Sequence, residues 1–149
     1  MTTKPDSVYW CGDSDCLENI IQLRYDVLRK PWQQSKDTAS DDLEGSSFNA
    51  YIKNERGEFV ACGRLQKNST VLGQIRYMAV AEDCRGLGYG KRVLQFLEEK
   101  AKAEGVMSIE LQARENALDF YVKNGYHVKE KSFLLWGIIQ HYLMEKKLT

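Results

Sequence analysis

The sequence has only two prolines and two histidines among its 149 residues, and its 21 basic side chains balance 21 acidic ones. Balanced charge creates no global field that would attract nucleic acid or an anionic membrane surface, so neither partner is expected. No apolar run approaches the roughly 18 residues that a membrane span requires. The polar first residues lack the apolar run of a secretory signal, and we therefore expect a cytoplasmic protein.

Cysteine is also sparse. The four cysteines lie at positions 11, 16, 62 and 84, and without a secretory signal they are expected to be reduced thiols. Cys11 and Cys16 do not have the spacing of a zinc knuckle, and both histidines lie near the C-terminal end of the chain. We expect no structural metal site and no metal cofactor.

The composition is that of an ordinary globular protein, with 43% apolar and 28% charged residues. The length suits a single domain, residues 1–149, which buries roughly two-thirds of the surface of its unfolded chain. No repeat, linker or low-complexity tract divides it.

Hydrophobic periodicity predicts a mixed α/β chain (α+β). Asp15 and Glu18 resemble a capping box that opens an amphipathic helix, and Pro31 is expected to end it. A polar loop, 32–47, follows, with about one helical turn. Further helices are expected at 88–104, closed by Gly105, and at 115–124. Strands are expected at 7–11, 48–53, 59–65, 71–80, 107–112, 126–133 and 138–144.

This order predicts a mostly antiparallel mixed sheet of about seven strands with about four helices. The strand–helix–strand unit in the middle of the chain implies a right-handed parallel crossover. Parallel pairing is therefore expected only where the strands of this unit meet.

Three alternating glycines, Gly86, Gly88 and Gly90, stand between a predicted strand and a predicted helix. Glycine lets the backbone approach a ligand, and a helix N-terminus offers unpaired N–H groups to phosphate. The same glycines could serve only a tight bend. The spacing is not that of a P-loop, because Lys91 is followed by Arg92 rather than a hydroxyl residue, and it is not G-x-G-x-x-G.

The stretch Arg85-Gly86-Leu87-Gly88-Tyr89-Gly90 matches the R-x-x-G-x-G signature of the GNAT acetyltransferase superfamily. Residues 116–126 resemble the second block of that family, N-A-x-x-F-Y-x-x-x-G-F, with Tyr126 in place of Phe. The preceding stretch, 78–84, also resembles the family, although Glu82 replaces its common proline. The resemblance covers about residues 17–148 and implies the GNAT fold.

The resemblance implies a site for acetyl-coenzyme A. The loop amides would cradle its pyrophosphate, β-type bonds from the fourth strand would hold the pantetheine arm, and one N–H of that strand would steady the thioester oxyanion. Asn116 would bond a pantetheine amide, unless it only caps the short helix. The implied coenzyme-binding residues are Met78, Ala79, Val80, Arg85, Gly86, Leu87, Gly88, Tyr89, Gly90, Lys91, Asn116 and Phe120.

The matched position of Tyr121 implies a general acid that protonates the departing thiolate; the alternative is a core aromatic beside Phe120. Some family members carry a glutamate base on the fourth strand, but residues 74–78 contain no carboxylate. Glu110 and His141 are the candidate bases, and histidine has a suitable pKa near neutrality. A relay of ordered water remains the third possibility.

The acceptor is expected to enter over the first helix and the loop that follows it. The acids of that loop, Asp41, Asp42 and Glu44, would suit a cationic amine, and the arginines of the preceding helix would suit an anionic group. Trp136 could close over the acceptor or form a contact of a homodimer. Arg24, Tyr25, Arg29 and Trp32 are further candidate lining residues.

The function expected from the resemblance is acetyl transfer from acetyl-CoA to a primary amine of a small molecule or peptide, by direct attack. A covalent route through Cys84 is the mechanistic alternative, since Arg85 next to it would lower the thiol pKa. A non-catalytic acyl-CoA binding or sensing module of the same fold is the functional alternative, supported by the missing carboxylate.

Overall fold

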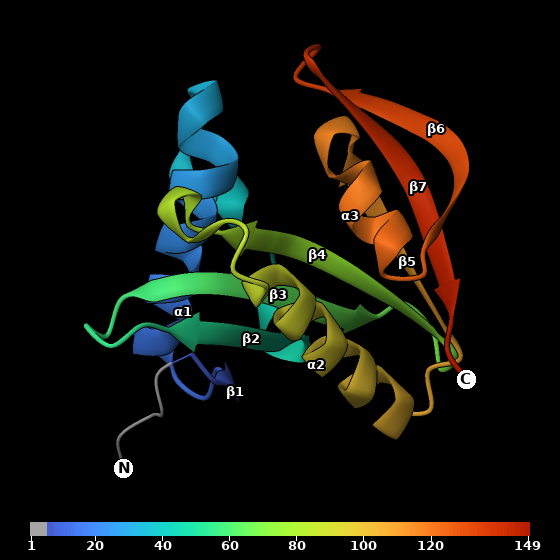
Figure 1. Cartoon of the computed structure of the whole chain (residues 1–149), viewed down its shortest axis with the longest axis horizontal. Coiled ribbons are helices and arrows are strands. Elements are labelled where there is room, and N and C mark those ends of the chain that lie inside the picture. Colours follow the sequence, from blue (N-terminus) through green and yellow to red (C-terminus); the bar gives the residue numbers. More distant parts are fainter. Residues whose placement is uncertain (1–5) are drawn as a thin grey trace.

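Seven strands form one mixed sheet in the computed structural model, which describes residues 6–149 (Figure 1). Residues 1–5, on which part of the expectation about a secretory signal rested, lie outside the described residues. The sheet order is β1-β2-β3-β4-β5-β7-β6, and only β4 and β5 are parallel. The strands are β1 (Val8–Trp10), β2 (Phe48–Lys53), β3 (Phe59–Lys67), β4 (Leu72–Val80), β5 (Ser108–Arg114), β6 (His127–Leu135) and β7 (Ile139–Lys147).

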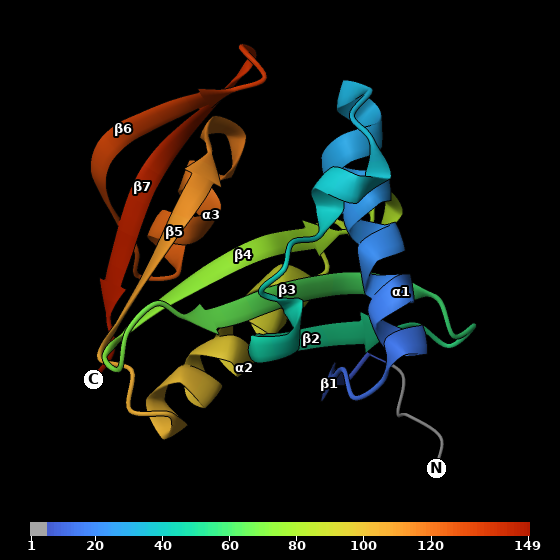
Figure 2. The ribbon, with the colours of Figure 1, turned by 180° about the vertical axis from the view of Figure 1, so that it is seen from behind.

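Two long helices cover opposite faces of the sheet. Helix α2 (Tyr89–Ala103) crosses one face, whereas α1 (Ser14–Arg24) lies on the other, as the front and rear views show (Figures 1 and 2). The short helix α3 (Leu118–Lys123) lies beside β5. No helix in residues 6–149 is long and apolar enough to cross a membrane. The predicted mixed sheet and its single parallel crossover are confirmed.

The first helix differs from its prediction at both ends. Its N-cap is Asp13, whose carboxylate accepts the N–H of Cys16 at 2.8 Å, so Asp15 is not the cap. At the other end, helical structure continues past Pro31. The α-helix instead passes into a π-helical turn, Tyr25–Arg29, and a 3-10 turn, Lys30–Trp32, which contains Pro31 near its start. Proline is tolerated there because an early position in a turn needs no N–H donor.

Successive side chains of the strands point to opposite faces of the sheet and form two hydrophobic cores, one on each face. Ala50, Ile52 and Ala61 face α2 and pack with its buried apolar stripe, Val93, Leu94, Leu97 and Ala101. The intervening Tyr51 and Cys62 pack with Ile20 and Leu23 of α1. Both faces of the central strands are therefore buried, as the period-2 geometry of a strand requires when each face carries a helix.

A β-bulge distorts β4 at the middle of the sheet. Cys62 pairs with Ala79 and Arg64 with Arg76, so that Tyr77 and Met78 together oppose one residue of β3. Tyr77 has φ +55°, a left-handed conformation that is unfavourable for a bulky residue unless the surroundings hold it. The bulge bends β4 away from the line of β5.

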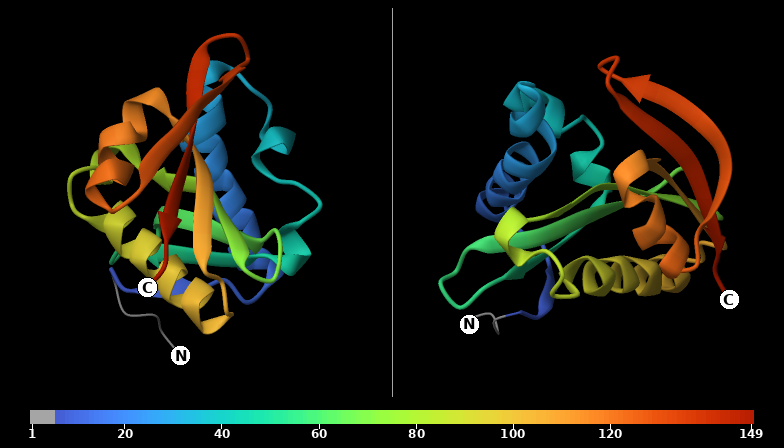
Figure 3. Two further views of the ribbon diagram at one scale, coloured as in Figure 1. Left: turned by 90° about the vertical axis from the view of Figure 1, so that its right-hand side faces the viewer. Right: turned by 45° about the horizontal axis from the view of Figure 1, so that its top comes forward.

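Parallel pairing between β4 and β5 ends at Ile75 and Leu111. Beyond that point β4 runs on to Val80 and β5 to Arg114 without pairing with each other, and the two halves of the sheet diverge (Figure 3). On the β5 side, residues 76–80 therefore have no strand partner within residues 6–149, which leaves this edge of β4 open to a ligand.

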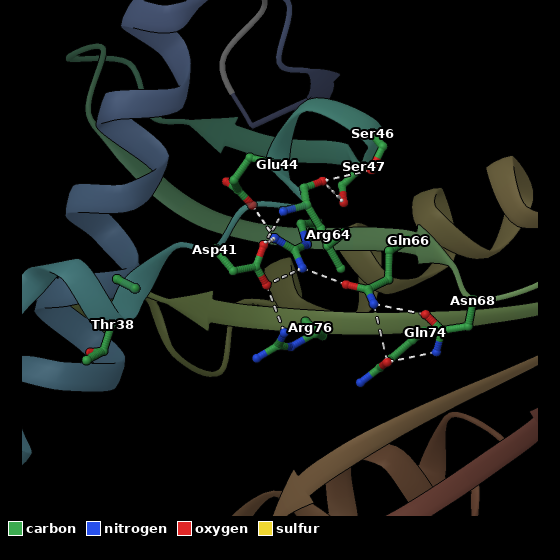
Figure 4. A network of polar contacts seen from close by, with 12 residues as sticks. Thr38, Asp41, Glu44, Ser46, Ser47, Arg64, Gln66, Asn68, Gln74 and Arg76 are labelled. Carbon is green, nitrogen blue, oxygen red and sulfur yellow. Dashed lines mark hydrogen bonds and ion pairs between the residues drawn. The ribbon is translucent and has the colours of Figure 1, made fainter.

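A network of buried arginines attaches the loop 33–47 to the sheet (Figure 4). The side chain of Arg64 is 0% exposed, donates to both carboxylate oxygens of Asp41 at 2.7 and 2.9 Å, and is also paired with Glu44. Glu44 accepts from Arg24 as well, at 3.0 Å. Buried cations are tolerable only when paired and hydrogen-bonded, so Asp41 and Glu44 are committed to these arginines.

The Asp41 pairing makes stability pH-dependent. Hydrogen bonds from Arg64 lower the pKa of Asp41 from its ordinary 3.8 to about 2. The stabilisation is thus fully present above the unfolded-state pKa and is lost as the pH falls from 3.8 through about 2. Asp41→Asn should be less stable than the wild type at pH 7, by denaturant unfolding, and this difference should shrink as the pH falls through that window.

The exposed Asp42 provides a control, and Asp42→Asn should follow the wild-type curve. A stability gap between wild type and Asp41→Asn that is independent of pH would show that the ion pair contributes nothing.

Candidate functional site

A pocket of about 1010 Å³ occupies the divergence between β4 and β5. It is lined by the second half of β4, the loop before α2, the end of β5, α3 and the strands β6 and β7. Residues 27–29 of the π-helical turn line it too. Because that turn and α2 lie on opposite faces of the sheet, the pocket extends from one face to the other through the gap.

The glycine loop forms one end of this pocket. Gly86 and Gly88 have φ angles of +80° and +84°, which only glycine adopts without strain. Gly88 is the N-cap of α2, and no side chain caps the helix. The first N–H groups of α2 therefore lack intrahelical partners and favour an anion.

Gly90 has a different role from the other two. A Cβ at this position would lie 3.3 Å from Cζ of Phe120 and 3.6 Å from Cγ2 of Val80. A side chain would displace the ring of Phe120, so glycine lets α2 approach α3 at the pocket floor. The two sequence blocks of the family resemblance thus meet in space here.

Most of the predicted site residues line this one pocket. Two do not: the side chain of Leu87 is 62% exposed, and Glu110 lies in the paired part of β5, where it accepts from Asn68 at 3.4 Å. Asn116 lies inside a 3-10 turn, Glu115–Ala117, and caps neither that turn nor α3. The predicted residues that the pocket brings together are Met78, Ala79, Val80, Arg85, Gly86, Gly88, Tyr89, Gly90, Lys91, Asn116, Phe120, Tyr121 and His141.

Tyr121 is both buried and part of the pocket wall. Its side chain is 7% exposed, and its ring makes edge contacts with Phe120 and Tyr126 at centroid distances of 5.0 and 5.8 Å. Burial raises the pKa of the Tyr121 phenol well above its ordinary value. The hydroxyl is therefore protonated at neutral pH, as a proton donor must be.

His141 is held on β7 in a defined orientation. Its ring stacks on Phe133 at 4.5 Å, and its Nδ1 lies 3.0 Å from the carbonyl oxygen of Ile139. A carbonyl only accepts, so the neutral ring carries its proton on Nδ1 and leaves Nε2 as an acceptor. Burial, with a contribution from Arg114 and Arg29, lowers the pKa of His141 below its ordinary 6.5.

The thiol of Cys84 behaves differently from its prediction. It lines the pocket, but burial and the neighbouring Asp83 raise its pKa rather than lower it. The Cys84 thiol donates to a carboxylate oxygen of Asp83 at 3.6 Å, and the expected lowering of its pKa by Arg85 is not found. Since the thiolate is the nucleophilic form, this environment disfavours a covalent route.

The acceptor-side residues separate into two groups. Arg29 lines the pocket, whereas Arg24 is fully buried in the network with Glu44 and Asn49. Asp41 and Glu44 are absent from the pocket lining, which contains no carboxylate among the described residues. Arg114, Phe133, Leu135 and Lys123 line the pocket and were missed. The place of Arg114 in the pocket could have been predicted, because it ends the strand that follows the crossover helix and the two parallel strands separate at that end.

The pocket thus joins three features: a helix start with free N–H groups, a protonated phenol and a neutral imidazole. This combination is suited to acyl transfer. The sequence profile of the Acetyltransferase (GNAT) family matches residues 17–126. The chain belongs to this family, which confirms the predicted family and class of enzyme, a GNAT acetyltransferase.

Relatives agree with this assignment. The N-acetyltransferase YjcF of Bacillus subtilis is 28% identical over 130 residues, covering 87% of this chain and 91% of YjcF. Two other B. subtilis relatives match at 32% identity, and the chain spans about half the length of each.

Solved structures share the fold. A GNAT family acetyltransferase of Staphylococcus aureus has a TM-score of 0.79 at 15% identity and covers 96% of this chain and 100% of its own. An aminoglycoside 6'-N-acetyltransferase solved with coenzyme A has a TM-score of 0.78 at 13% identity, with coverage of 94% and 96%. At this identity the likeness establishes the fold alone.

Gly88→Glu should abolish coenzyme binding, because it places a side chain and a negative charge at the start of α2. Gly105→Glu is the matched control: Gly105 has φ +81° and open space around it, and it lies at the opposite end of the same helix. Both variants bear similar backbone strain, and only Gly88→Glu should lose acetyl-CoA binding in calorimetry. Unchanged affinity in folded Gly88→Glu would refute the placement of the site.

Proposed function

We propose that this GNAT acetyltransferase transfers the acetyl group of acetyl-CoA to a primary amine of a small molecule or peptide by direct attack. The observation that carries the proposal is the pocket between β4 and β5, which joins the glycine loop to Tyr121 and His141. The donor would enter from the face of α2, and the acceptor from the face of the π-helical turn.

The coenzyme would be held by groups that the fold leaves without partners. The free N–H groups at the start of α2 would bind its pyrophosphate, assisted by the cations of Arg85 and Lys91. The unpaired edge of β4, residues 76–80, would bond the pantetheine amides as an added strand would. Asn116 and Phe120 would line the same channel. The cradle fits such a ligand because the space beside Gly86 and Gly88, at the start of α2, is open.

His141 is the proposed base. Its Nε2 would accept the proton that the attacking nitrogen loses as the new C–N bond forms, since the Ile139 carbonyl fixes the proton on Nδ1. Glu110 is the weaker candidate because the structure places it outside the pocket lining. The missing carboxylate on β4 is therefore no argument against catalysis.

Tyr121 is the proposed acid. As the C–S bond breaks, its hydroxyl would give its proton to the departing sulfur. Burial makes the phenol a weaker acid, but the same low-dielectric surroundings disfavour a thiolate and raise its affinity for the proton. The proton returns to Tyr121 from solvent after the thiol leaves.

Trp136 would close over the acceptor. It lies in the turn between β6 and β7, with its ring 5.3 Å from the guanidinium of Arg29 on the pocket wall. This contact supports a cover for the acceptor over a role in a homodimer.

Replacing Tyr121 by Phe should lower kcat by about ten- to a thousandfold with little change in acetyl-CoA affinity, because only proton donation is lost. Tyr126→Phe is the matched control: this phenol is buried too and donates to Glu98 at 2.8 Å, outside the pocket. The control should lose about 1–3 kcal/mol of stability and keep its turnover rate.

An unchanged rate in Tyr121→Phe would remove this residue from the mechanism. Tight binding of acetyl-CoA by the wild type with no thiol release for any amine would instead support a binding or sensing module.

The fall of kcat/KM at acidic pH, the acid limb of its pH profile, should reflect protonation of His141. Its base form exists above its pKa, which lies below 6.5, so kcat/KM should fall as the pH drops through that value. In His141→Gln this limb should disappear and the rate should fall by about 10²–10⁴. The Glu110→Gln variant should keep the acid limb of the pH profile. If the acid limb disappeared in Glu110→Gln and persisted in His141→Gln, then Glu110 and not His141 would be the base.

A further inference from the structure

The charges that line the pocket are all of one sign. Among the described residues, its ionic lining consists of cations without a carboxylate. Arg85, Lys91 and Lys123 lie on the loop, α2 and α3, where the coenzyme phosphates are proposed to bind. Arg29, Arg76 and Arg114 lie at the acceptor end and have no coenzyme phosphate to bind.

Two of the acceptor-end arginines have no anionic partner. Arg76 is paired with Asp41 at 2.9 Å, but no ion pair forms on Arg29 or Arg114 in residues 6–149. Arg29 donates to the carbonyl and hydroxyl oxygens of Thr38 and to the carbonyl of Leu28. Arg114 donates to the Leu28 carbonyl at 2.9 Å, which uses one N–H of the five on its guanidinium.

These two cations disfavour each other. Burial, and then the charge of Arg29, lowers the pKa of Arg114 to about 10, so it stays charged at neutral pH. Half-buried like charges that face a common pocket are unfavourable unless an anion joins them. A guanidinium offers two parallel N–H donors, which match a carboxylate or phosphate better than any neutral group.

The acids that could have balanced them are used elsewhere. Asp41 pairs with Arg64 and Arg76, and Glu44 with Arg24 and Arg64, all within the buried network (Figure 4). A polycationic acceptor would meet only positive charge in this pocket.

We propose that the acceptor is an amine that carries a carboxylate or phosphate group, which Arg114 and Arg29 bind. This inference rests on the proposed function and names the substrate class of the same site. Arg114 and His141 are paired residues of β5 and β7, and such partners have their Cβ atoms about 4.5–5.5 Å apart. The anion would therefore lie close to the base that serves the amine, which favours a short spacing between the two groups, as in an amino acid or an aminoalkyl phosphate.

The test compares amines in matched pairs that differ in charge: phenylalanine against phenylalaninamide, and O-phosphoethanolamine against ethanolamine. With rates corrected for the fraction of free amine, kcat/KM should be about tenfold or more higher for one or both anionic members than for their neutral partners. The pair that shows the larger preference distinguishes carboxylate from phosphate. Equal or better turnover of both neutral members would overturn the inference and leave the proposed function standing.

Arg114→Gln, and separately Arg29→Gln, should lower the ratio of kcat/KM for the anionic member to kcat/KM for its neutral partner about 10- to 100-fold, because an effect on His141 alone would change both members equally. Arg56→Gln is the matched control, since Arg56 is 78% exposed in the β2–β3 turn, outside the pocket. An equal loss for both members of a pair in folded variants would indicate a structural role and overturn the inference.

Binding separates this inference from the function on which it rests. Calorimetry would titrate N-acetylphenylalanine and N-acetylphenylalaninamide into the protein loaded with coenzyme A. Tighter binding of the acid than of the amide, if it is lost in Arg114→Gln, would support the anion site even if no amine were acetylated. The absence of acetylation for every amine would refute the proposed function and leave the anion site standing. Equal affinity for the acid and the amide, together with equal turnover of O-phosphoethanolamine and ethanolamine, would overturn the anion site.

Discussion

The end of parallel pairing at Ile75 and Leu111 is the constraint on which the site depends. A continuous sheet would satisfy the backbone of β4 on both edges and close the space that the pocket occupies. The bulge at Tyr77 prevents this because an extra residue turns the strand away from β5. The free strand edge and the pocket that passes through the sheet both follow from this one distortion, and so does the proposed approach of two substrates from opposite faces.

The bulge is held by charge. The ring of Tyr77, in its left-handed conformation, has the guanidinium groups of Arg24, Arg64 and Arg76 at 4.3, 5.0 and 4.8 Å from its centroid. Asp41 and Glu44 neutralise these arginines from the loop. The network therefore contacts the distorted strand and also holds Asp41 and Glu44 outside the pocket. The shape of the pocket and the positive charge of its lining thus share a cause.

The two proposed catalytic groups obtain their properties from burial rather than from a dedicated ionic partner. Desolvation keeps the phenol of Tyr121 protonated and the imidazole of His141 neutral. These are the protonation states required of an acid and a base at the start of acetyl transfer. A carboxylate on β4 is unnecessary for this division of roles, because β7 brings an imidazole to the same pocket.

The sequence by itself determined the fold class and the family, and it located the glycine loop at the start of a helix. Glycines at 86, 88 and 90, the helix that follows and the block at 116–126 are local patterns whose geometry is set by backbone sterics and short-range periodicity. Only the tertiary structure decided which base candidate reaches the pocket, that Asp41 and Glu44 are committed to arginines, and that Arg114 lines the pocket. Those facts depend on contacts between β3, β5, β7 and the loop 33–47, and the side-chain pairing of segments far apart in the chain leaves no periodic signal in the sequence.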